Sequence, residues 1–246
     1  MENIKEILNQ QLADDFCCSV NEVKNHQHIF TYYEPRMNRR KYTDDNTCFL
    51  KIACIHGKLL VSGEKSIVDW CREKYHNSNA AWFMEYGNLH ELDCKMHEYG
   101  YRVGLAHPFY ISDEITQQPD IKGDIVWYEE NEIERFRGDL RFHEAFAFCQ
   151  SAPDRIGVSL QREGQILGMA GASSDSMKMW QIGIDVLSEY RGEHIGTALV
   201  ILLKNELLKR GILPFYGTAM SHIASQNVAF HAGFYPAWTE LYVQKN

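Results

Sequence analysis

Apolar residues recur at two different spacings along the first half of the chain. Around Leu8 they repeat every three to four residues, which predicts an amphipathic helix, and on either side of Gly57 they form short runs, which predicts a hairpin. The elements that these patterns predict are a helix over 2–13, strands over 48–54 and 58–61, a helix capped by Ser66 and running to Tyr75, a helix over 85–99 ended by Gly100, and a strand over 101–111. We therefore expect a small α+β domain over residues 1–115.

The second half of the chain is more regular and follows a polar stretch. Residues 112–123 contain Pro and Gly without periodicity, so we expect a linker there and a domain boundary near 115–120. Beyond it, the predicted elements are strands over 125–128, 156–160, 166–172, 179–186, 215–219 and 238–243, and helices over 133–149, 192–210 and 223–232. Residues 120–246 are thus predicted to form a second domain, of mixed α/β order.

The composition is typical of a packed globular protein. Of 246 residues, 45% are hydrophobic and 24% are charged. No apolar run approaches the ~20 residues that span a bilayer, and no apolar segment typical of a signal peptide follows Met1. The seven cysteines form no Cys-x-x-Cys pair, and their odd number is typical of reduced thiols. We expect a cytoplasmic protein with no membrane partner.

Charge and histidine spacing narrow the function classes further. The net charge of −8 argues against a nucleic-acid partner, because binding to the phosphate backbone needs a basic surface. An acidic protein instead favours encounter with cationic small molecules. His90 and His97 flank Cys94, but they are seven residues apart, which is too far to share one ion without other ligands. We therefore predict no metal site.

The segment from the strand over 179–186 to the helix over 192–210 carries the clearest chemical signal. Every second residue of the strand is large and apolar, and a glycine within it, Gly183, marks a bulge or a close approach of another chain or a ligand. Gly192 and Gly196 then lead into a helix, whose first N–H groups and dipole favour an anion such as a phosphate. Ordinary capping glycines explain the same fragment equally well. Neither a Walker loop nor a Gly-x-Gly-x-x-Gly motif is present.

With these residues in place, residues 120–246 resemble the GNAT N-acetyltransferase superfamily. The loop pattern of that family, Arg/Gln-x-x-Gly-x-Gly/Ala, matches at Arg191 and Gly196, with His194 at the position of the first patterned glycine. A second motif, residues 225–234, resembles the family's helix that ends in Gly-Phe. The whole chain is similar to the subfamily that includes zwittermicin-resistance-like proteins.

The resemblance implies a mixed, splayed central sheet flanked by helices, with acetyl-CoA as co-substrate in a V-shaped opening between two central strands. It implies that the backbone of residues 184–186 pairs with the pantetheine arm and that the N–H groups of residues 192–197 hold the pyrophosphate. The residues that the resemblance assigns to acetyl-CoA are Ile184, Asp185, Val186, Arg191, Gly192, Glu193, His194, Ile195, Gly196, Thr197 and Ser225.

The catalytic side is less complete in this chain. Counting back from Gly233, the family's Asn and Tyr positions fall on His222 and Ala229, so no tyrosine acid carries over at that place. A base-like Glu of many members is replaced by Gly217. Candidates for proton transfer are His222, Tyr216 and Asp185. A chain of water molecules can also carry the proton, in which case no side chain acts as the base.

The resemblance implies an enzyme that transfers an acetyl group to a primary amine of a small molecule or peptide by direct attack on the thioester. A non-catalytic acyl-CoA-binding sensor is the alternative from another class, and a donor with a longer acyl group or an aminoacyl group is the third. Neither the acceptor nor the oligomeric state follows from the sequence.

Overall fold

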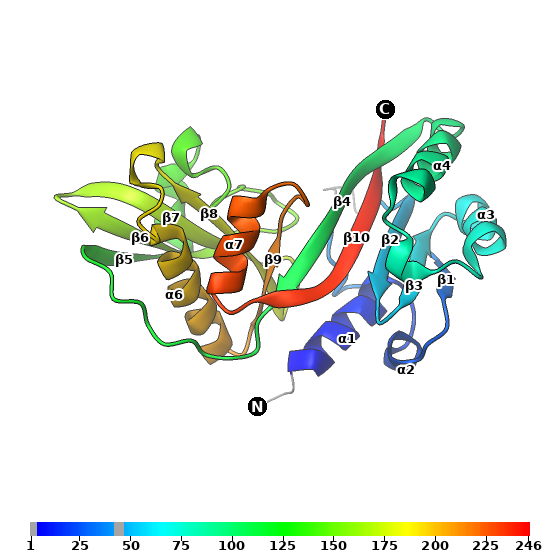
Figure 1. Cartoon of the computed structure of the whole chain (residues 1–246), viewed down its shortest axis with the longest axis horizontal. Helices are drawn as coiled ribbons and strands as arrows, with labels where there is room; N and C mark the ends of the chain where they lie inside the picture. The colour runs from blue at the N-terminus through cyan, green and yellow to red at the C-terminus, as the bar shows by residue number, and fades with distance from the viewer. Residues whose placement is uncertain (1–3, 42–46) are drawn as a thin grey trace. The chain divides into compact units, whose positions relative to one another are not determined.

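The computed structural model describes residues 4–41 and 47–246, which divide into two compact units. Unit 1 comprises residues 4–7 and 110–236, and unit 2 comprises residues 8–109 and 237–246 (Figure 1). By compactness, the C-terminal residues from 237 on therefore group with residues 8–109. That the segments 1–115 and 120–246 fold as independent domains stays a prediction.

Unit 2 is built on a mixed sheet. Its strands lie in the order β1-β3-β2-β10-β4, of which β4 and β10 continue into unit 1. Their bounds are β1 Ile29–Tyr32, β2 Leu50–Ile55, β3 Lys58–Gly63, β4 Tyr101–Ile111 and β10 Tyr235–Lys245. The antiparallel pair β2–β3 is the predicted hairpin, and Gly57 takes a φ of +75° in its turn, a value that glycine adopts without strain. The strand predicted over 101–111 is confirmed residue for residue.

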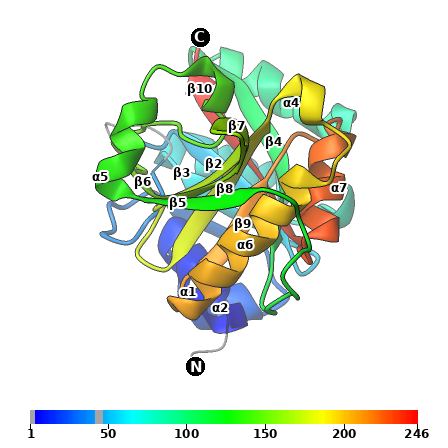
Figure 2. The same ribbon diagram turned by 90° about the vertical axis from the view of Figure 1, so that its left-hand side faces the viewer.

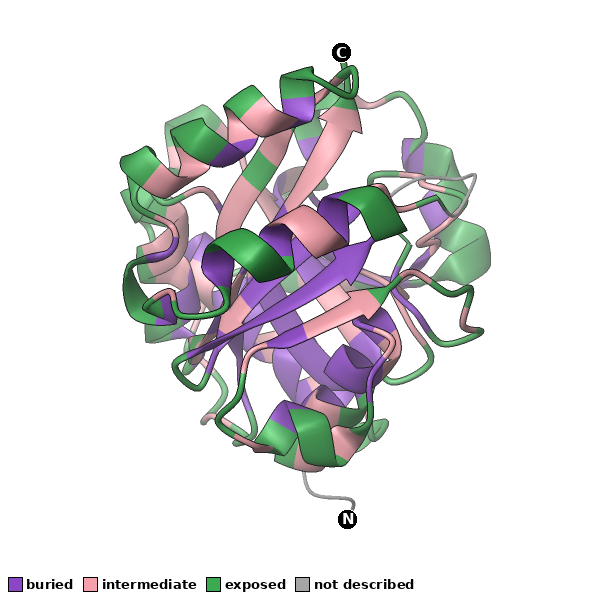
Figure 3. Cartoon of the chain, turned by 90° about the vertical axis from the view of Figure 1, so that its right-hand side faces the viewer, coloured by how far each residue is buried: buried purple, intermediate pink, exposed green. Residues whose placement is uncertain are grey.

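Helices cover this sheet and bury an apolar core against it. They are α1 Ile4–Asp15, α2 Val20–Lys24, α3 Lys65–Tyr75 and α4 Tyr86–His97, with a 3-10 turn at Ala80–Trp82. Figure 3 shows helices with green, exposed outer turns in front of purple, buried strands. The predicted cap at Ser66 is wrong, because Glu64 is the N-cap of α3 and Ser66 lies in its first turn. Glu64 follows the last residue of β3, and its N–H still donates to the carbonyl of Phe49, the residue before β2, so the helix begins after Glu64.

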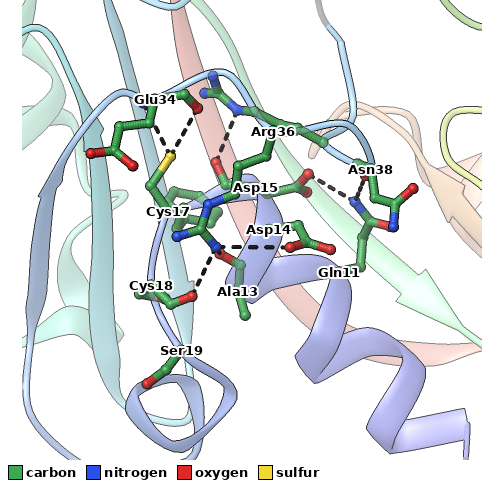
Figure 4. Close-up of polar contacts among 12 residues, drawn as sticks. Gln11, Ala13, Asp14, Asp15, Cys17, Cys18, Ser19, Glu34, Arg36 and Asn38 are labelled. Carbon is green, nitrogen blue, oxygen red and sulfur yellow. Dashed lines mark hydrogen bonds and ion pairs between the residues drawn. The ribbon is translucent and has the colours of Figure 1, made fainter.

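Polar contacts fasten the chain after β1 to the end of α1 (Figure 4). The Arg36 guanidinium donates to the carbonyls of Ala13 and Cys18, each at 3.1 Å, and the Gln11 amide donates to the Asn38 carbonyl at 2.7 Å. The two side chains thus tie the end of α1 and the residues after it to the segment that follows β1.

A buried ionic cluster continues from this point into the sheet of unit 2. Asp15 accepts from the Arg40 guanidinium at 2.5 Å, and Arg40 also pairs with Glu240 of β10 at 2.9 Å. The side chains of all three residues are at most 3% exposed. Removing one partner from such a cluster leaves a buried charge without compensation.

Within unit 1, the strands lie in the order β5-β6-β7-β8-β9. Its strands are β5 Asp124–Glu129, β6 Asp154–Arg162, β7 Gln165–Ser173, β8 Met179–Val186 and β9 Leu213–Gly217. Neighbours are antiparallel from β5 to β8, and β8–β9 is parallel. Helix α6, Ile195–Lys209, runs across these strands, and α7, Ile223–His231, lies beside it (Figure 2). The mixed α+β fold predicted for the chain is confirmed, and each strand predicted between 125 and 219 is present.

The helix predicted over residues 133–149 is wrong. The chain forms only the short helix α5, Glu130–Ile133, and two 3-10 turns at Glu134–Phe136 and Leu140–Phe142. Gly138 takes a φ of +83°, which interrupts a right-handed helix. The apolar spacing instead reflects a second core on the face of the sheet opposite α6, to which Phe136, Phe142 and Phe146 contribute.

The connection between β4 and β5 is irregular, as the polar stretch predicts, but it is held against α6. The fully buried Lys204 Nζ donates to the Glu114 carbonyl at 2.8 Å and to the hydroxyls of Ser112 and Thr116 at 3.3 and 2.5 Å. Asn205 bonds both the N–H and the carbonyl of Thr116. Two polar residues on one helix therefore fix the path of the connection.

Candidate functional site

The parallel strands β8 and β9 pair only over their first residues. Their register ends at Gln181↔Phe215, although β8 continues to Val186 and β9 to Gly217. On its other edge, β8 stays paired with β7 as far as Gly168↔Val186. The edge of Ile184–Val186 that faces β9 is therefore left without a neighbouring strand, and such an edge can take an extended ligand through backbone hydrogen bonds.

The N-terminus of α6 lies over this open end of β8. The first bond of the helix runs from the Ala198 N–H to the His194 carbonyl at 3.0 Å, so the N–H groups of the three preceding residues have no intrahelical acceptor. A Cβ added to Gly196 would lie 3.4 Å from Val186, 3.7 Å from Ile184 and 3.6 Å from Val228. The first turn of α6 thus lies within van der Waals reach of the unpaired end of β8, and it combines free N–H donors with the positive end of a helix dipole.

His194 is the N-cap of α6 and stands in the left-handed region, with φ 60° and ψ 15°. This backbone conformation favours glycine, and it explains why the loop pattern places a glycine there. Histidine adopts it more readily than most residues, at a cost of about 1 kcal/mol. The loop therefore keeps its turn, and His194 contributes its backbone N–H and no side-chain cap.

Two charged side chains of the loop are used in holding its shape. Arg191 Nε donates to the Val186 carbonyl at 3.3 Å, which ties the loop back to the end of β8. Glu193 pairs with Arg162 of β6 at 2.9 Å. The resemblance assigns both residues to acetyl-CoA, whereas their side chains here anchor the loop that presents the N–H groups.

The structure brings Tyr216 and Ser225 together on the other side of the opening. The Tyr216 hydroxyl, on β9, is 2.8 Å from the Ser225 hydroxyl in the first turn of α7. Burial raises the pKa of Tyr216, and the Glu144 and Asp185 carboxylates raise it further, while the bond to Ser225 lowers it. A buried phenol with a hydroxyl partner can donate a proton to a developing anion nearby.

The hydrogen bonds and exposure of Asp185 and His222 are not those of a general base. Asp185 Oδ2 accepts from the backbone N–H groups of Glu144 and Ala145, at 2.8 and 3.0 Å. Burial raises the pKa of Asp185, and these two N–H donors counteract the rise. His222 is exposed at the N-cap of α7, where its own N–H donates to the Ala219 carbonyl. Among the described residues, no hydrogen bond joins His222 to Tyr216, Ser225 or Asp185.

Glu144 also lies beside Asp185, and no sequence pattern singles it out. It was predicted to lie within a helix, whereas it stands in a turn beside Asp185, with its side chain 70% exposed. The local signal is the mid-strand Gly183, for which the sequence left open a bulge or the close approach of another chain or a ligand. The structure shows that the Glu144 carbonyl of the same chain packs against it. The partner of that approach is 39 residues away in sequence, so no local pattern identifies it.

Comparison with known proteins agrees with the part of the chain that carries this geometry. Residues 124–234 match the sequence profile of the acetyltransferase (GNAT) family. No curated protein matches the chain. Within residues 4–41 and 47–246, no helix is long and apolar enough to cross a membrane, and no three potential metal-binding side chains of His, Cys, Asp or Glu gather in one place.

Solved structures of GNAT proteins are similar at low sequence identity. A GCN5-related N-acetyltransferase-like protein from Streptococcus suis aligns over 95% of this chain and 98% of its own, with 13% identity and a TM-score of 0.48. A GNAT-family protein from Novosphingobium aromaticivorans aligns over 60% of this chain and 68% of its own, with 19% identity and a TM-score of 0.44.

A third solved structure, an acetyltransferase of the GNAT family from Colwellia psychrerythraea, aligns over 59% of this chain, with 16% identity and a TM-score of 0.42. The alignment spans only 57% of that protein. The family match over residues 124–234 therefore identifies this segment, which contains the open end of β8 and the N-terminus of α6, as similar to the acetyltransferase (GNAT) family.

Proposed function

We propose that unit 1 transfers an acetyl group from acetyl-CoA to a primary amine. The observation that carries this proposal is the position of the α6 N-terminus over the unpaired end of β8, within the segment that matches the acetyltransferase profile. The pairing of two such features suits a ligand that is extended at one end and anionic at the other. Acetyl-CoA has both properties and supplies an activated acyl group when bound.

The residues present fit this co-substrate. The backbone edge of Ile184–Val186, which has no neighbouring strand, would bind the amide-rich arm, and the N–H groups of Gly192–Thr197 would bind the pyrophosphate. A Cβ at Gly196 would meet only ordinary contacts, so the pattern's Gly or Ala both fit beside Val186. A backbone N–H on the same edge would stabilise negative charge that develops on the acyl oxygen.

Tyr216 and Ser225 would handle the proton of the leaving thiolate. As the amine nitrogen bonds to the acyl carbon and the carbon–sulfur bond breaks, the nitrogen loses a proton to water and the sulfur takes one from the Tyr216 hydroxyl. Ser225, 2.8 Å from that hydroxyl, would return a proton from solvent. This arrangement supplies a phenol from β9, whereas the family's tyrosine position is Ala229, which is fully buried.

A thermal-shift titration with acetyl-CoA tests the proposal. A ligand at a hundred times its Kd adds about 2.7 kcal/mol to the free energy of unfolding, which raises Tm by about 5–10 °C for a chain of this size. Gly196→Asp should abolish the shift by placing a carboxylate at the N-terminus of α6. Gly196→Ala is the matched control and should keep it, since the added Cβ lies 3.4 Å or more from its neighbours. Absence of a shift with the wild-type protein would refute the proposal.

The missing tyrosine at Ala229 favours a second candidate, a non-catalytic sensor of acyl-CoA. A sensor would show the same thermal shift without turnover of any amine. Competition between acetyl-CoA and longer acyl-CoA molecules in the same titration would identify the preferred acyl group.

A further inference from the structure

The buried ionic cluster of unit 2 holds more cations than carboxylates. Its five charged side chains, each at most 4% exposed, are Arg39, Arg40, Lys51, Asp15 and Glu240. Of the buried charged side chains that the structure describes in unit 2, the remaining one is Lys58, whose ammonium donates to the Glu22 carbonyl. With all five ionised, the cluster carries one excess positive charge. Buried charges are normally paired, so this excess points to a further negative charge.

Asp15 lies at the centre of the cluster and is already occupied by other donors. Its Oδ2 accepts from Arg40 Nε at 2.5 Å and is 3.9 Å from Lys51 Nζ. Its Oδ1 accepts from the Gln11 amide at 2.9 Å and from the Arg40 N–H at 2.8 Å (Figure 4). Arg39 Nε reaches only the backbone carbonyl of Asp15, at 3.1 Å. Arg39 is therefore the cation that this carboxylate does not neutralise.

Two hydrogen-bond donors of the same region are buried without an acceptor. Neither Arg39 Nη2 nor the Ser62 hydroxyl has a hydrogen-bond partner within residues 4–41 and 47–246. The Arg39 guanidinium stacks over the Tyr33 ring at 4.2 Å, a contact that satisfies no N–H group. Ser62 is fully buried and stands directly opposite Lys51 in the β2–β3 pair, so the two side chains are neighbours on one face. Buried donors almost always have an acceptor, and these two lie beside the excess charge.

The acceptor that suits this place is small and carries a single negative charge. A water molecule would satisfy the donors but would leave the excess charge. A phosphate or a carboxylate ligand needs an opening, whereas the groove of about 580 Å³ beside β1 is lined by other residues of unit 2. A halide ion accepts from a guanidinium and from a hydroxyl, and it needs no opening once the chain has folded around it.

We propose that unit 2 binds one chloride-sized monovalent anion beside Arg39, Lys51 and Ser62. The anion accepts from Arg39 Nη2 and from the Ser62 hydroxyl, and its charge balances the cluster. Loss of the Lys51 proton would also balance the charge, but it would leave the Arg39 donor unsatisfied. Burial lowers the pKa of Lys51, the carboxylates of Asp15 and Glu240 raise it, and a neighbouring anion adds to the rise and keeps the ammonium charged.

Thermal unfolding of the full chain in sodium chloride and in sodium gluconate, at equal ionic strength, tests the inference. Gluconate is too large for an enclosed site, so chloride alone binds the folded state. Chloride at about ten times its Kd should raise Tm by about 3–6 °C relative to gluconate for a chain of this size. Equal Tm values in the two salts would overturn the proposal.

Two variants separate this site from a general effect of salt. Arg39→Met removes the excess charge and one donor, so the rise in Tm with chloride should disappear. Ser62→Ala keeps every charge and removes one hydrogen bond to the anion, so the Kd for chloride should increase about tenfold. Arg137→Met is the control and should keep the full rise, because its guanidinium is exposed and paired with Glu134. An unchanged rise in Ser62→Ala, or in a folded Arg39→Met, would refute the site.

Bromide locates the anion directly. A crystal of the wild-type protein soaked in sodium bromide should show an anomalous peak within about 3.5 Å of Arg39 Nη2. A water molecule there without anomalous signal would overturn the proposal. A bromide peak combined with equal Tm values in chloride and gluconate would show binding at crystal concentration only, and would overturn it as well.

Discussion

Gly183→Ala should destabilise the protein far more than a glycine-to-alanine change usually does. The added Cβ would stand 1.8 Å from the Glu144 carbonyl oxygen, about 1.5 Å inside normal contact, so the turn over β8 must move. That movement also breaks the two bonds from Asp185 Oδ2 to the Glu144 and Ala145 N–H groups. Overpacking of this kind costs about 1–3 kcal/mol, and the two lost hydrogen bonds add about 1 kcal/mol each.

The expected loss in the free energy of unfolding is therefore about 3–5 kcal/mol. For a chain of this size it lowers Tm by about 6–20 °C, which differential scanning calorimetry measures directly. Gly87→Ala is the matched control, because Gly87 lies in α4 and nothing stands within 4 Å of its added Cβ. That variant should gain about 0.5–1 kcal/mol from helix propensity.

The double variant Gly183→Ala with Asp185→Ala sharpens the test. If the clash already displaces the turn, the second change has little left to remove, and the two losses are strongly non-additive. A Tm for Gly183→Ala within about 2 °C of the wild type would refute the reasoning. Full additivity of the two losses would show that Gly183 and Asp185 do not hold the same turn.

Three further predictions concern charge and backbone strain. Burial lowers the pKa of Lys204 to about 8, so between pH 8 and 10.5 the unfolded state binds more protons than the folded state. Over this range, the free energy of unfolding of the wild-type protein should rise by up to about 3 kcal/mol relative to that of Lys204→Met. Urea denaturation measures both values, and a constant difference between them across the range would contradict the prediction. His194→Gly should raise Tm by removing about 1 kcal/mol of left-handed strain, whereas His194→Ala should not, and equal effects of the two would show that the strain is absent. Burial raises the pKa of Asp15, but the charges of Arg40 and Lys51 lower it more, so the ionised carboxylate stabilises the fold at neutral pH and this stabilisation is lost in acid. Asp15→Asn should lower the free energy of unfolding, measured by urea denaturation, by about 3–5 kcal/mol at pH 7 and by little at pH 2. An equal loss at both pH values would contradict the ionic role.

Local sequence patterns were sufficient wherever neighbours in sequence are also neighbours in the fold. The hairpin around Gly57, the strand over 179–186 and the hairpin of β6 and β7 follow from alternation and a turn residue, and the structure confirms them. The loop into α6 also follows from adjacent residues, although the helix begins at Ile195, three residues later than predicted, because His194 takes the left-handed cap position.

Local patterns failed where contacts distant in sequence override the preference of a segment. The helix predicted over 133–149 does not form, because an irregular chain there buries Phe136, Phe142 and Phe146 in the core on the face of the sheet opposite α6. Ser66 is a suitable cap, but the start of α3 is set by the bond from the Glu64 N–H to Phe49.

The candidate site shows the same division. The sequence by itself located the segment that we propose binds acetyl-CoA, namely Ile184–Val186 and the loop that ends at Thr197, because that motif is contiguous. Only the tertiary structure decided that β8 and β9 part after Gln181, that Tyr216 meets Ser225, and that Gly183 receives the turn of Glu144. Strand register and the packing of a turn on a sheet depend on residues far apart in the chain, so no single stretch of sequence encodes them.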